Sequence, residues 1–273
     1  MSAPEARYQH LQISTGGGGH CLPDLSIGDA RFETMDPQQR AIAEDFDQYR
    51  ETYDQAVNKA IAFSGLTVDK FTTAKARDLV GLIGAHFNSP GDVRVLDVGC
   101  GIGNYHPQLV PAVGSVTGID VSQACIETAR SRNPAVTYDV YDGDRLPYGD
   151  GAFSVAYCVC VVHHVPPASW QKFAGELARV VRPGGMVVVY EHNPWHPLTR
   201  KVVNDCAFDR DAVLIAMPAM RVLLRNAGCV KVSTRSILTL PPGHAIFERL
   251  DGLFSHLPFG SQYRALGYIG SAT

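Results

Sequence analysis

The chain has 273 residues, of which 45% are hydrophobic and 19% are charged, and its formal net charge is −3. This length accommodates one α/β unit with additions, and the absence of a basic excess argues against nucleic acid or an anionic membrane as a partner. The longest apolar run, about eight residues, is too short to span a bilayer.

Residues 1–36 show no periodicity and lack the basic start and apolar stretch of a signal peptide. They include "STGGGGHC" (14–21), which has no preceding strand and no following Gly-Lys-Ser/Thr, so we expect a flexible arm and not a phosphate loop. The seven cysteines, spread from Cys21 to Cys229, do not form a disulfide pattern. A reduced, cytoplasmic setting is therefore expected.

Residues 37–90 are predicted to form a helical cap. Apolar residues recur at helical spacing through the first half of this segment, and a second helical pattern covers 69–87. The first pattern consists of Ile42, Phe46, Tyr49, Tyr53, Val57 and Ile61.

The centre of the chain alternates short apolar runs with helical patterns. Strands are predicted at 93–99, 115–122, 135–142, 153–160 and 186–192. Ser122 is a candidate cap for the helix that follows it, and a helix at 169–185 is expected to stop at Pro183 and Gly184. Such alternation indicates a parallel sheet with helices on both faces.

The tail predicts one helix at 217–228, with Pro218 at its start and Gly228 just past its end, and two strands at 229–240 and 261–270. The expected fold is α/β: a Rossmann-like, doubly wound, mostly parallel seven-stranded sheet with an N-terminal helical cap. One domain is expected at 37–273, with its core at 91–192 and an insert plus the final strands at 193–273.

The segment "VLDVGCGIGNY" (95–105) places Gly99, Gly101 and Gly103 at a strand-to-helix turn, where backbone N–H groups can approach a ligand closely. By itself the pattern suits a dinucleotide or another adenosyl compound. The dinucleotide fingerprint needs its third glycine at position 104, which is Asn104. NAD is therefore disfavoured, and an NAD-dependent oxidoreductase stays as an alternative.

The run Asp97-x-Gly99-x-Gly101-x-Gly103 resembles the first motif of the class I S-adenosylmethionine-dependent methyltransferases, and the similarity extends over about 42–192. "GID" at 118–120 resembles the second-strand acidic motif of that family, which implies that Asp120 accepts hydrogen bonds from both ribose hydroxyls. The resemblance also implies that Asp142 faces the adenine amino group and Gly143 the adenine ring. It places Tyr53 and Cys158 near the methionine part of the cofactor. The implied cofactor-binding residues are Tyr53, Asp97, Gly99, Gly101, Gly103, Asp120, Val121, Asp142, Gly143 and Cys158.

Candidate bases follow the fourth and fifth predicted strands, because open α/β sheets bind ligands at the carboxyl ends of their strands. They are His163, His164, Glu191 and His192. Histidine titrates near neutrality and suits removal of a proton from a phenol or hydroxyl. "VVHHV" also resembles the Leu-His-His segment of many small-molecule members of the family, in which one histidine faces the acceptor. The alternative is that these histidines cap a helix or pack beneath the cofactor.

Two cysteines and two histidines, Cys158, Cys160, His163 and His164, raise the question of a metal site. Cys158 and Cys160 are expected on one face of a strand and the histidines beyond its end, and one short segment does not easily supply four converging ligands. We therefore expect no metal.

The predicted function is methyl transfer from S-adenosylmethionine to a small-molecule acceptor, with a hydroxyl or phenol of a biosynthetic intermediate as the first choice. N- or C-methylation and a non-catalytic cofactor-binding protein stay as alternatives, and a homodimer stays open. The cap and the insert predict a partly apolar acceptor, although the same side chains suit plain core: Tyr49, Tyr53, Trp195, Phe208, Met217 and Met220.

Overall fold

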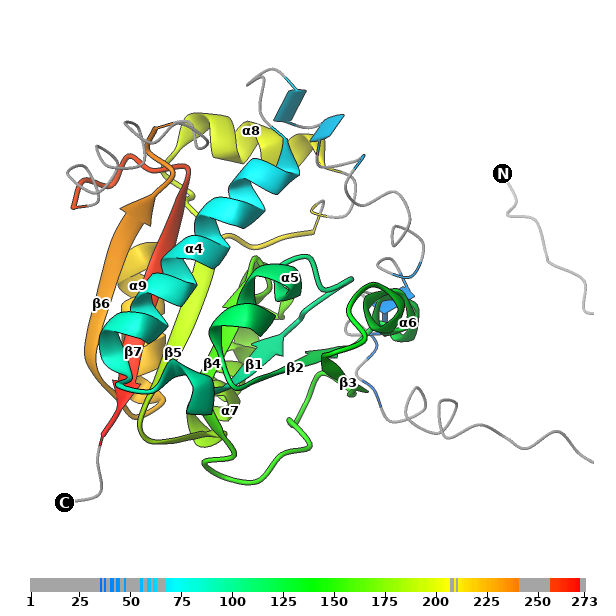
Figure 1. Ribbon diagram of the computed structural model, residues 1–273. Coiled ribbons are helices and arrows are strands. Elements are labelled where there is room, and N and C mark those ends of the chain that lie inside the picture. Colours follow the sequence, from blue (N-terminus) through cyan, green and yellow to red (C-terminus); the bar gives the residue numbers. More distant parts are fainter. Residues whose placement is uncertain are drawn as a thin grey trace, which may run out of the picture.

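The computed structural model describes residues 67–206, 209, 211–240 and 256–270, together with single positions between 35 and 62. Seven strands form one sheet in the order β3-β2-β1-β4-β5-β7-β6 (Figure 1). Pairing is parallel from β3 through β5, and β7 runs antiparallel to β5 and β6. This confirms the predicted mostly parallel sheet. The strands are β1 (Arg94–Val98), β2 (Ser115–Asp120), β3 (Thr137–Val140), β4 (Phe153–Val159), β5 (Val181–His192), β6 (Cys229–Ile237) and β7 (Gln262–Ile269).

Helices cover both faces of the sheet (Figure 1). One face packs against α4 (Val68–His86), α5 (His106–Leu109) and α6 (Gln123–Arg132). The other packs against α7 (Trp170–Arg179) and α9 (Met217–Asn226). Helix α8 (Pro197–Asp205) follows the end of β5. The arrangement is the doubly wound one expected from the sequence.

Strand β4 shows why the central strands read as continuous apolar runs. Val155 and Tyr157 enter the core layer that contains α4, whereas Ala156 and Cys158 enter the layer that contains α7. Because both faces of this strand are covered, alternation between apolar and polar residues disappears. The predicted strands were recognisable for this reason.

The predicted helix at 169–185 is wrong at its C-terminal end. Helix α7 ends at Arg179, and β5 begins at Val181 with an irregular register, because Phe153 pairs with Val181 whereas Val155 pairs with Met186. A bulge of this kind tolerates Pro183, which has no N–H to donate to a sheet ladder.

Two predicted helix boundaries are confirmed. Ser122 caps α6, since its side-chain oxygen accepts a hydrogen bond from the Cys125 backbone N–H at 3.0 Å. Helix α9 begins at Met217, and Gly228 follows its end with φ +93°. Gly228 occupies the left-handed region that glycine enters without a steric penalty.

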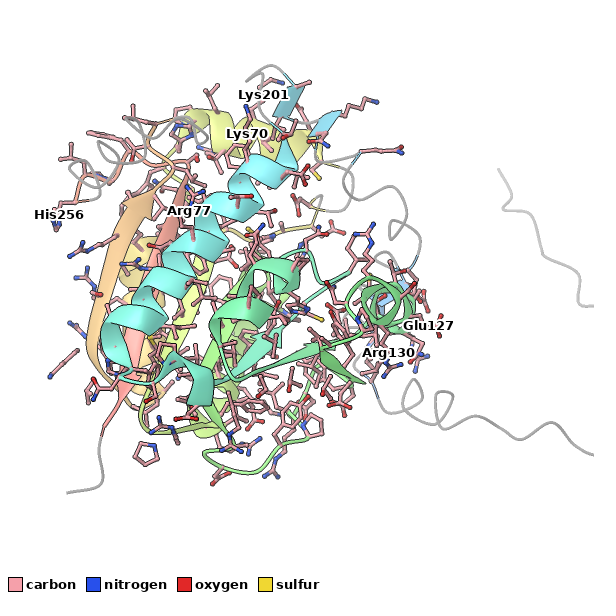
Figure 2. All side chains as sticks on the ribbon, viewed as in Figure 1. Lys70, Arg77, Glu127, Arg130, Lys201 and His256 are labelled. Atoms are coloured by element: carbon pink, nitrogen blue, oxygen red, sulfur yellow. The ribbon has the colours of Figure 1, made fainter. Side chains whose placement is uncertain are left out.

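The predicted arm at 1–36 lies outside the described residues apart from Met35, as does most of the first half of the cap. Described positions there, such as Ala41, Ala43 and Asp47, are helical, and α4 confirms the second helical segment. The residues labelled in Figure 2 are exposed: Lys70, Arg77, Glu127, Arg130, Lys201 and His256. Within the described part of the chain, no helix combines the length and apolarity needed to cross a membrane.

Candidate active site

The predicted site residues gather at the edge of the sheet where the parallel strands end. Register places Asp97 of β1 beside Gly118 of β2 and Tyr157 of β4, and Val159 of β4 beside Tyr190 of β5. The glycine turn after β1, the acidic end of β2, the histidines after β4 and the end of β5 therefore share one edge. Ligands of open α/β sheets bind at this edge.

The glycine turn combines a tight backbone with open space. Gly99, Gly101 and Gly103 have φ values of +73°, +50° and +74°. A Cβ at Gly99 would lie 2.5 Å from Val161 Cγ2, and one at Gly103 would lie 2.6 Å from Tyr138 Oη. A Cβ at Gly101 would meet no atom within 4 Å, so the turn presents bare backbone to free space there. That surface suits the close approach of a ligand.

Asp120 is held directly beside this turn. Its Oδ2 accepts the Gly101 backbone N–H at 2.7 Å, and its Oδ1 accepts the Ser122 N–H at 2.9 Å. Burial raises the pKa of Asp120 to about 6, against the opposing effect of these two hydrogen bonds. Asp120 therefore lies at the end of β2 beside the glycine turn, and its ribose-binding role stays a prediction.

Asp97 supports the turn from inside the molecule, through a group that we name the loop cluster (Asp97, His106, Tyr138 and Tyr157). Asp97 Oδ2 accepts the Tyr157 hydroxyl at 2.7 Å and lies 3.0 Å from His106 Nε2. His106 Nδ1 lies 2.5 Å from Tyr138 Oη. The four residues are buried. The sequence analysis missed His106, whose only signal is that it opens α5 directly after the glycine turn.

The remaining predicted cofactor contacts lie around the same edge. Gly143 has φ +79°, and Asp142 Oδ1 accepts the Asp144 N–H at 2.9 Å, which shapes the turn after β3. Val121 is half-buried next to Asp120, and Cys158 is fully buried within β4. Tyr53 lies outside the described residues. The cofactor roles of these side chains stay predictions.

Beyond β4, four side chains form what we name the rim cluster (His163, His164, Glu191 and Asp209). Strand β4 ends at Val159, and Cys160 departs from the predicted strand with φ +57°. A short 3-10 turn, Val162–His164, then brings His163 Nδ1 to 2.7 Å from Glu191 Oε2. Glu191 Oε1 accepts the Val162 N–H at 2.7 Å. Both oxygens of this fully buried carboxylate are thus engaged by the turn.

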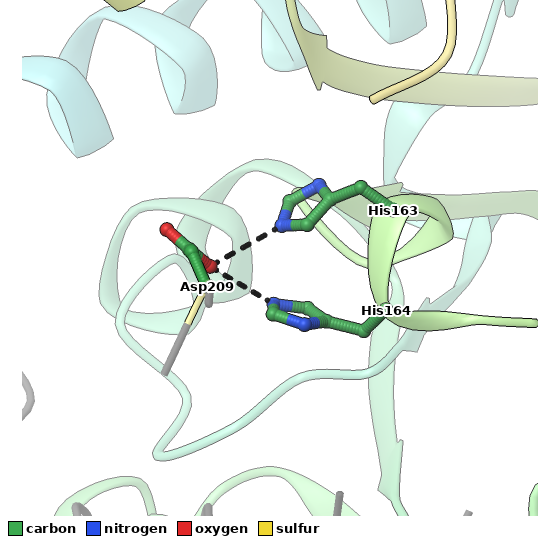
Figure 3. Close-up of side chains that lie close together, drawn as sticks. All are labelled: His163, His164 and Asp209. Atoms are coloured by element: carbon green, nitrogen blue, oxygen red, sulfur yellow. Dashed lines mark ion pairs between the residues drawn. The ribbon is translucent and has the colours of Figure 1, made fainter. Parts of the chain in front are cut away.

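Asp209 completes the rim cluster from a distant part of the chain. Its Oδ1 lies 3.5 Å from His163 Nε2 and 3.3 Å from His164 Nε2 (Figure 3). Backbone bonds hold this segment in place, since the Val213 N–H donates to the His163 carbonyl at 2.9 Å and the Ala212 N–H to the Asp209 carbonyl at 3.0 Å. The sequence analysis missed Asp209 because its segment carries no periodic pattern.

Electrostatics differ among the histidines at this edge. Burial would lower the pKa of His163, but the Glu191 charge and the hydrogen bond with Asp209 raise it well above its usual value. Burial and the neighbouring His163 charge lower the pKa of His164. The same two causes lower the pKa of His192 to about 4. Burial would raise the pKa of Asp209, but its hydrogen bonds with His163 and His164 lower it. His163 is therefore the charged histidine of the group at neutral pH.

Other predicted acceptor-side residues divide between surface and core. Trp195 is 53% exposed, whereas Met217 and Met220 are buried in the core beneath α9, so the core interpretation of the two methionines holds. Tyr49 and Phe208 lie outside the described residues. The sequence analysis also passed over Lys75 of α4, whose buried ammonium lies 5.7 Å from the centre of the Tyr105 ring.

The family model and two curated relatives that this chain resembles are described as methyltransferases. Residues 95–185 match a family model described as a methyltransferase domain. The 27-O-demethylrifamycin SV methyltransferase of Amycolatopsis mediterranei is 29% identical over 244 residues, which cover 80% of this chain and 84% of that protein. The 2-methyl-6-phytyl-1,4-hydroquinone methyltransferase of Synechocystis sp. is 39% identical over 108 residues, or 38% of this chain and 33% of that protein.

Solved structures show the same fold. A methyltransferase of Thermotoga maritima described as a possible histamine N-methyltransferase superposes with a TM-score of 0.60 at 17% identity, covering 83% of this chain and 99% of that one. Some curated relatives are matched over only part of their length, 54% of one and 33% of another.

Proposed function

We propose that this chain, which belongs to the class I S-adenosylmethionine-dependent methyltransferases, transfers a methyl group to a hydroxyl oxygen of a small-molecule acceptor. The observation that carries the proposal is the rim cluster, in which the half-buried His164 and the buried His163, Glu191 and Asp209 meet at the edge that also holds the glycine turn. A hydroxyl gains most from such a cluster because it must lose its proton when it attacks. A relative whose name places the missing methyl group on an oxygen adds support.

The cofactor side is supported by the glycine turn. Its backbone would hold the methionine part where Gly101 faces open space, and Asp120 would accept hydrogen bonds from the ribose hydroxyls. Asp142 and Gly143 would border the adenine. S-adenosylmethionine, when bound, supplies a methyl carbon activated by its sulfonium. The protein then has to place the acceptor oxygen in line and take up its proton.

Within the rim cluster, the contacts suggest a division of roles. Both ring nitrogens of His163 face carboxylates, so we assign His163 and Glu191 to positioning. The His164 side chain is 12% exposed against 1% for His163, and its lowered pKa keeps it neutral at pH 7. With Nε2–H directed at Asp209, His164 Nδ1 is an acceptor for the hydroxyl proton. His192, with a pKa of about 4, is too weak a base for this step.

We also propose that the reaction occurs in a reducing, cytoplasmic setting. No disulfide joins Cys100, Cys158, Cys160 or Cys229, although all four lie in the folded core or at its edge. Free buried thiols of this kind are usual where the environment keeps cysteines reduced.

The test uses S-adenosylmethionine with an isotopically labelled methyl group and a panel of hydroxyl, amine and activated-carbon acceptors. We expect label in an ether product, identified by mass spectrometry, and loss of that product in His164→Gln. Label on nitrogen or carbon would replace O-methylation with the corresponding alternative. Cofactor binding with no transfer to any compound would favour a non-catalytic cofactor-binding protein.

A further inference from the structure

We propose that His163, His164 and Asp209 form a binding site for one divalent transition-metal ion, with Zn²⁺ and Co²⁺ as the ions that suit its donors. The two imidazoles and the carboxylate each offer one ligand atom, and these atoms lie within 4.8 Å of one another. Figure 3 shows both histidines directed at the same Asp209 oxygen. Two imidazole nitrogens and one carboxylate oxygen are the donor set of zinc sites that keep a fourth position open.

The two contacts of Asp209 with the histidines are long for hydrogen bonds, and their lengths equal the separation of two ligands that share an ion. Asp209 Oδ1 stands 3.5 Å from His163 Nε2 and 3.3 Å from His164 Nε2. Charge-assisted hydrogen bonds between nitrogen and carboxylate span about 2.7–2.9 Å. Two ligands of a tetrahedral ion, at bond lengths of about 2.1 Å, stand about 3.4 Å apart. By contrast, the contact of His163 Nδ1 with Glu191 Oε2, at 2.7 Å, has the length of a true hydrogen bond.

Glu191 orients His163 for this role. When His163 Nδ1–H donates to Glu191, the Nε2 lone pair of the neutral ring points at the Asp209 carboxylate. Two acceptors then face each other, which requires a positive charge between them; in the ion-free chain this charge is the second proton of the His163 ring. A metal ion meets this requirement, and the carboxylate–histidine–metal arrangement is the usual one around metal-binding histidines. The Val162 N–H holds the other Glu191 oxygen at 2.7 Å, which keeps the orienting carboxylate in place.

The charge of the cluster also favours a divalent ion. Glu191 and Asp209 are both buried and both contact His163. One imidazolium balances only one of the two carboxylates, whereas a divalent ion balances both. A hard cation such as Mg²⁺, which prefers oxygen ligands, does not suit the two imidazoles.

This inference departs from the sequence-based expectation of no metal. That expectation considered Cys158 and Cys160 as partners of the histidines, whereas the third donor is Asp209, from a distant segment. The open position of the ion would bind the acceptor oxygen and lower its pKa, so that the hydroxyl would release its proton to solvent water before the oxygen attacks, with His164 as a ligand in place of a base. That last step rests on the proposed function, but metal binding itself does not.

The experiment starts from the full chain, dialysed against a chelator and titrated with Zn²⁺ by calorimetry and with Co²⁺ by visible absorption. We expect one ion per chain, the absorption bands of tetrahedral Co²⁺, and no binding of Mg²⁺. The variants Asp209→Ala and His164→Ala should weaken Zn²⁺ binding by at least about 100-fold, and Glu191→Gln by about 10–100-fold. His192→Gln is the matched control, because the His192 ring lies tilted beside that of His163, with centroids 5.2 Å apart, and has no place in the donor set; the Zn²⁺ affinity of this variant should equal that of the wild type.

The inference is overturned if the wild type takes up no stoichiometric ion, or if Asp209→Ala and His164→Ala bind Zn²⁺ as tightly as the wild type. Circular dichroism checks that each variant is folded. If Asp209→Ala is unfolded, Asp209→Asn takes its place, because it keeps the shape of the side chain and removes the charge. We expect Asp209→Asn to weaken Zn²⁺ binding by at least about tenfold. S-adenosylmethionine titrations on the same samples separate the two proposals. Methyl transfer by a metal-free chain that takes up no Zn²⁺ overturns this inference alone. Stoichiometric Zn²⁺ uptake without cofactor binding or methyl transfer supports it and overturns the proposed function.

Discussion

The loop cluster and the rim cluster each place a buried histidine against a carboxylate at the same edge of the sheet, yet they are built for different purposes. His106 meets one carboxylate and one tyrosine hydroxyl, both within 3.0 Å. His163 meets two carboxylates, and the second contact is stretched to 3.5 Å and shared with His164. A closed, balanced network holds a backbone turn, whereas an unbalanced one is poised to bind or to exchange protons. Burial of a histidine alone does not distinguish the two.

The largest effect should come from the rim cluster. We expect His164→Gln to lower the methyl-transfer rate on an acceptor found in the panel by about 10²–10⁴-fold, the usual contribution of a positioned acid or base. The affinity for S-adenosylmethionine should not change, because the glycine turn is untouched. Single-turnover rates and calorimetric titration of the same variant measure both quantities. An unchanged methyl-transfer rate would show that His164 of the rim cluster takes no part in the chemical step.

A substitution in the loop cluster should lower the stability of the fold. We expect His106→Ala to lower the free energy of unfolding by about 3 kcal/mol, because Asp97 loses a buried hydrogen-bond partner and a cavity remains beneath the glycine turn. Denaturant unfolding measures this loss. His256→Ala is the control, since His256 is exposed and its removal should change stability by less than about 0.5 kcal/mol. Equal stability of both variants would contradict the structural role of His106.

Cofactor affinity should depend on the carboxylate next to the loop cluster. We expect Asp120→Asn to weaken S-adenosylmethionine binding by about 10–100-fold, the cost of replacing charged hydrogen bonds to the ribose by neutral ones. Asp139→Asn is the matched control, because Asp139 lies on the neighbouring strand β3 and accepts a hydrogen bond from Tyr148 at 2.8 Å. If both variants bind equally well, Asp120 is not the ribose ligand.

The smallest effect is a dependence on pH. The pKa of Asp120 is raised to about 6 in the folded chain, so its carboxylate becomes protonated as the pH falls through that value. Cofactor affinity should then decline by up to about tenfold per pH unit. The raised pKa also affects the stability of the cofactor-free chain. Asp120 stabilises the fold fully when the pH is below the ordinary pKa of an aspartate, and this stabilisation is lost as the pH rises through about 6. Calorimetric titrations with S-adenosylmethionine between about pH 5 and about pH 7 measure this pH dependence of cofactor affinity. The variant Asp120→Asn should abolish it.

Much of this architecture was readable from local sequence. The central strands appeared as apolar runs because helices bury both their faces, and the glycine turn appeared because Gly99 and Gly103 leave no room for a Cβ. The irregular start of β5 was hidden, since a helical pattern continues up to the bulge around Pro183. The residue types that signal these features lie within a few positions of one another in the sequence.

Asp209 and His106 were not predictable in the same way. Their roles arise from contacts between segments that only the folded sheet brings together, such as the backbone bond from Val213 to His163. A single sequence records residue types but not these distances. The pairing of His163 with Glu191 lay between the two cases, because parallel strands that end at one edge brought both residues into the predicted set.

The identity of the cofactor at the glycine turn decides between a methyltransferase and a nicotinamide enzyme. Calorimetric titration of the wild-type chain with S-adenosylmethionine, and separately with NAD, tests this without any knowledge of the acceptor. We predict one S-adenosylmethionine bound per chain and no binding of NAD. Binding of NAD in the absence of S-adenosylmethionine binding would contradict the account.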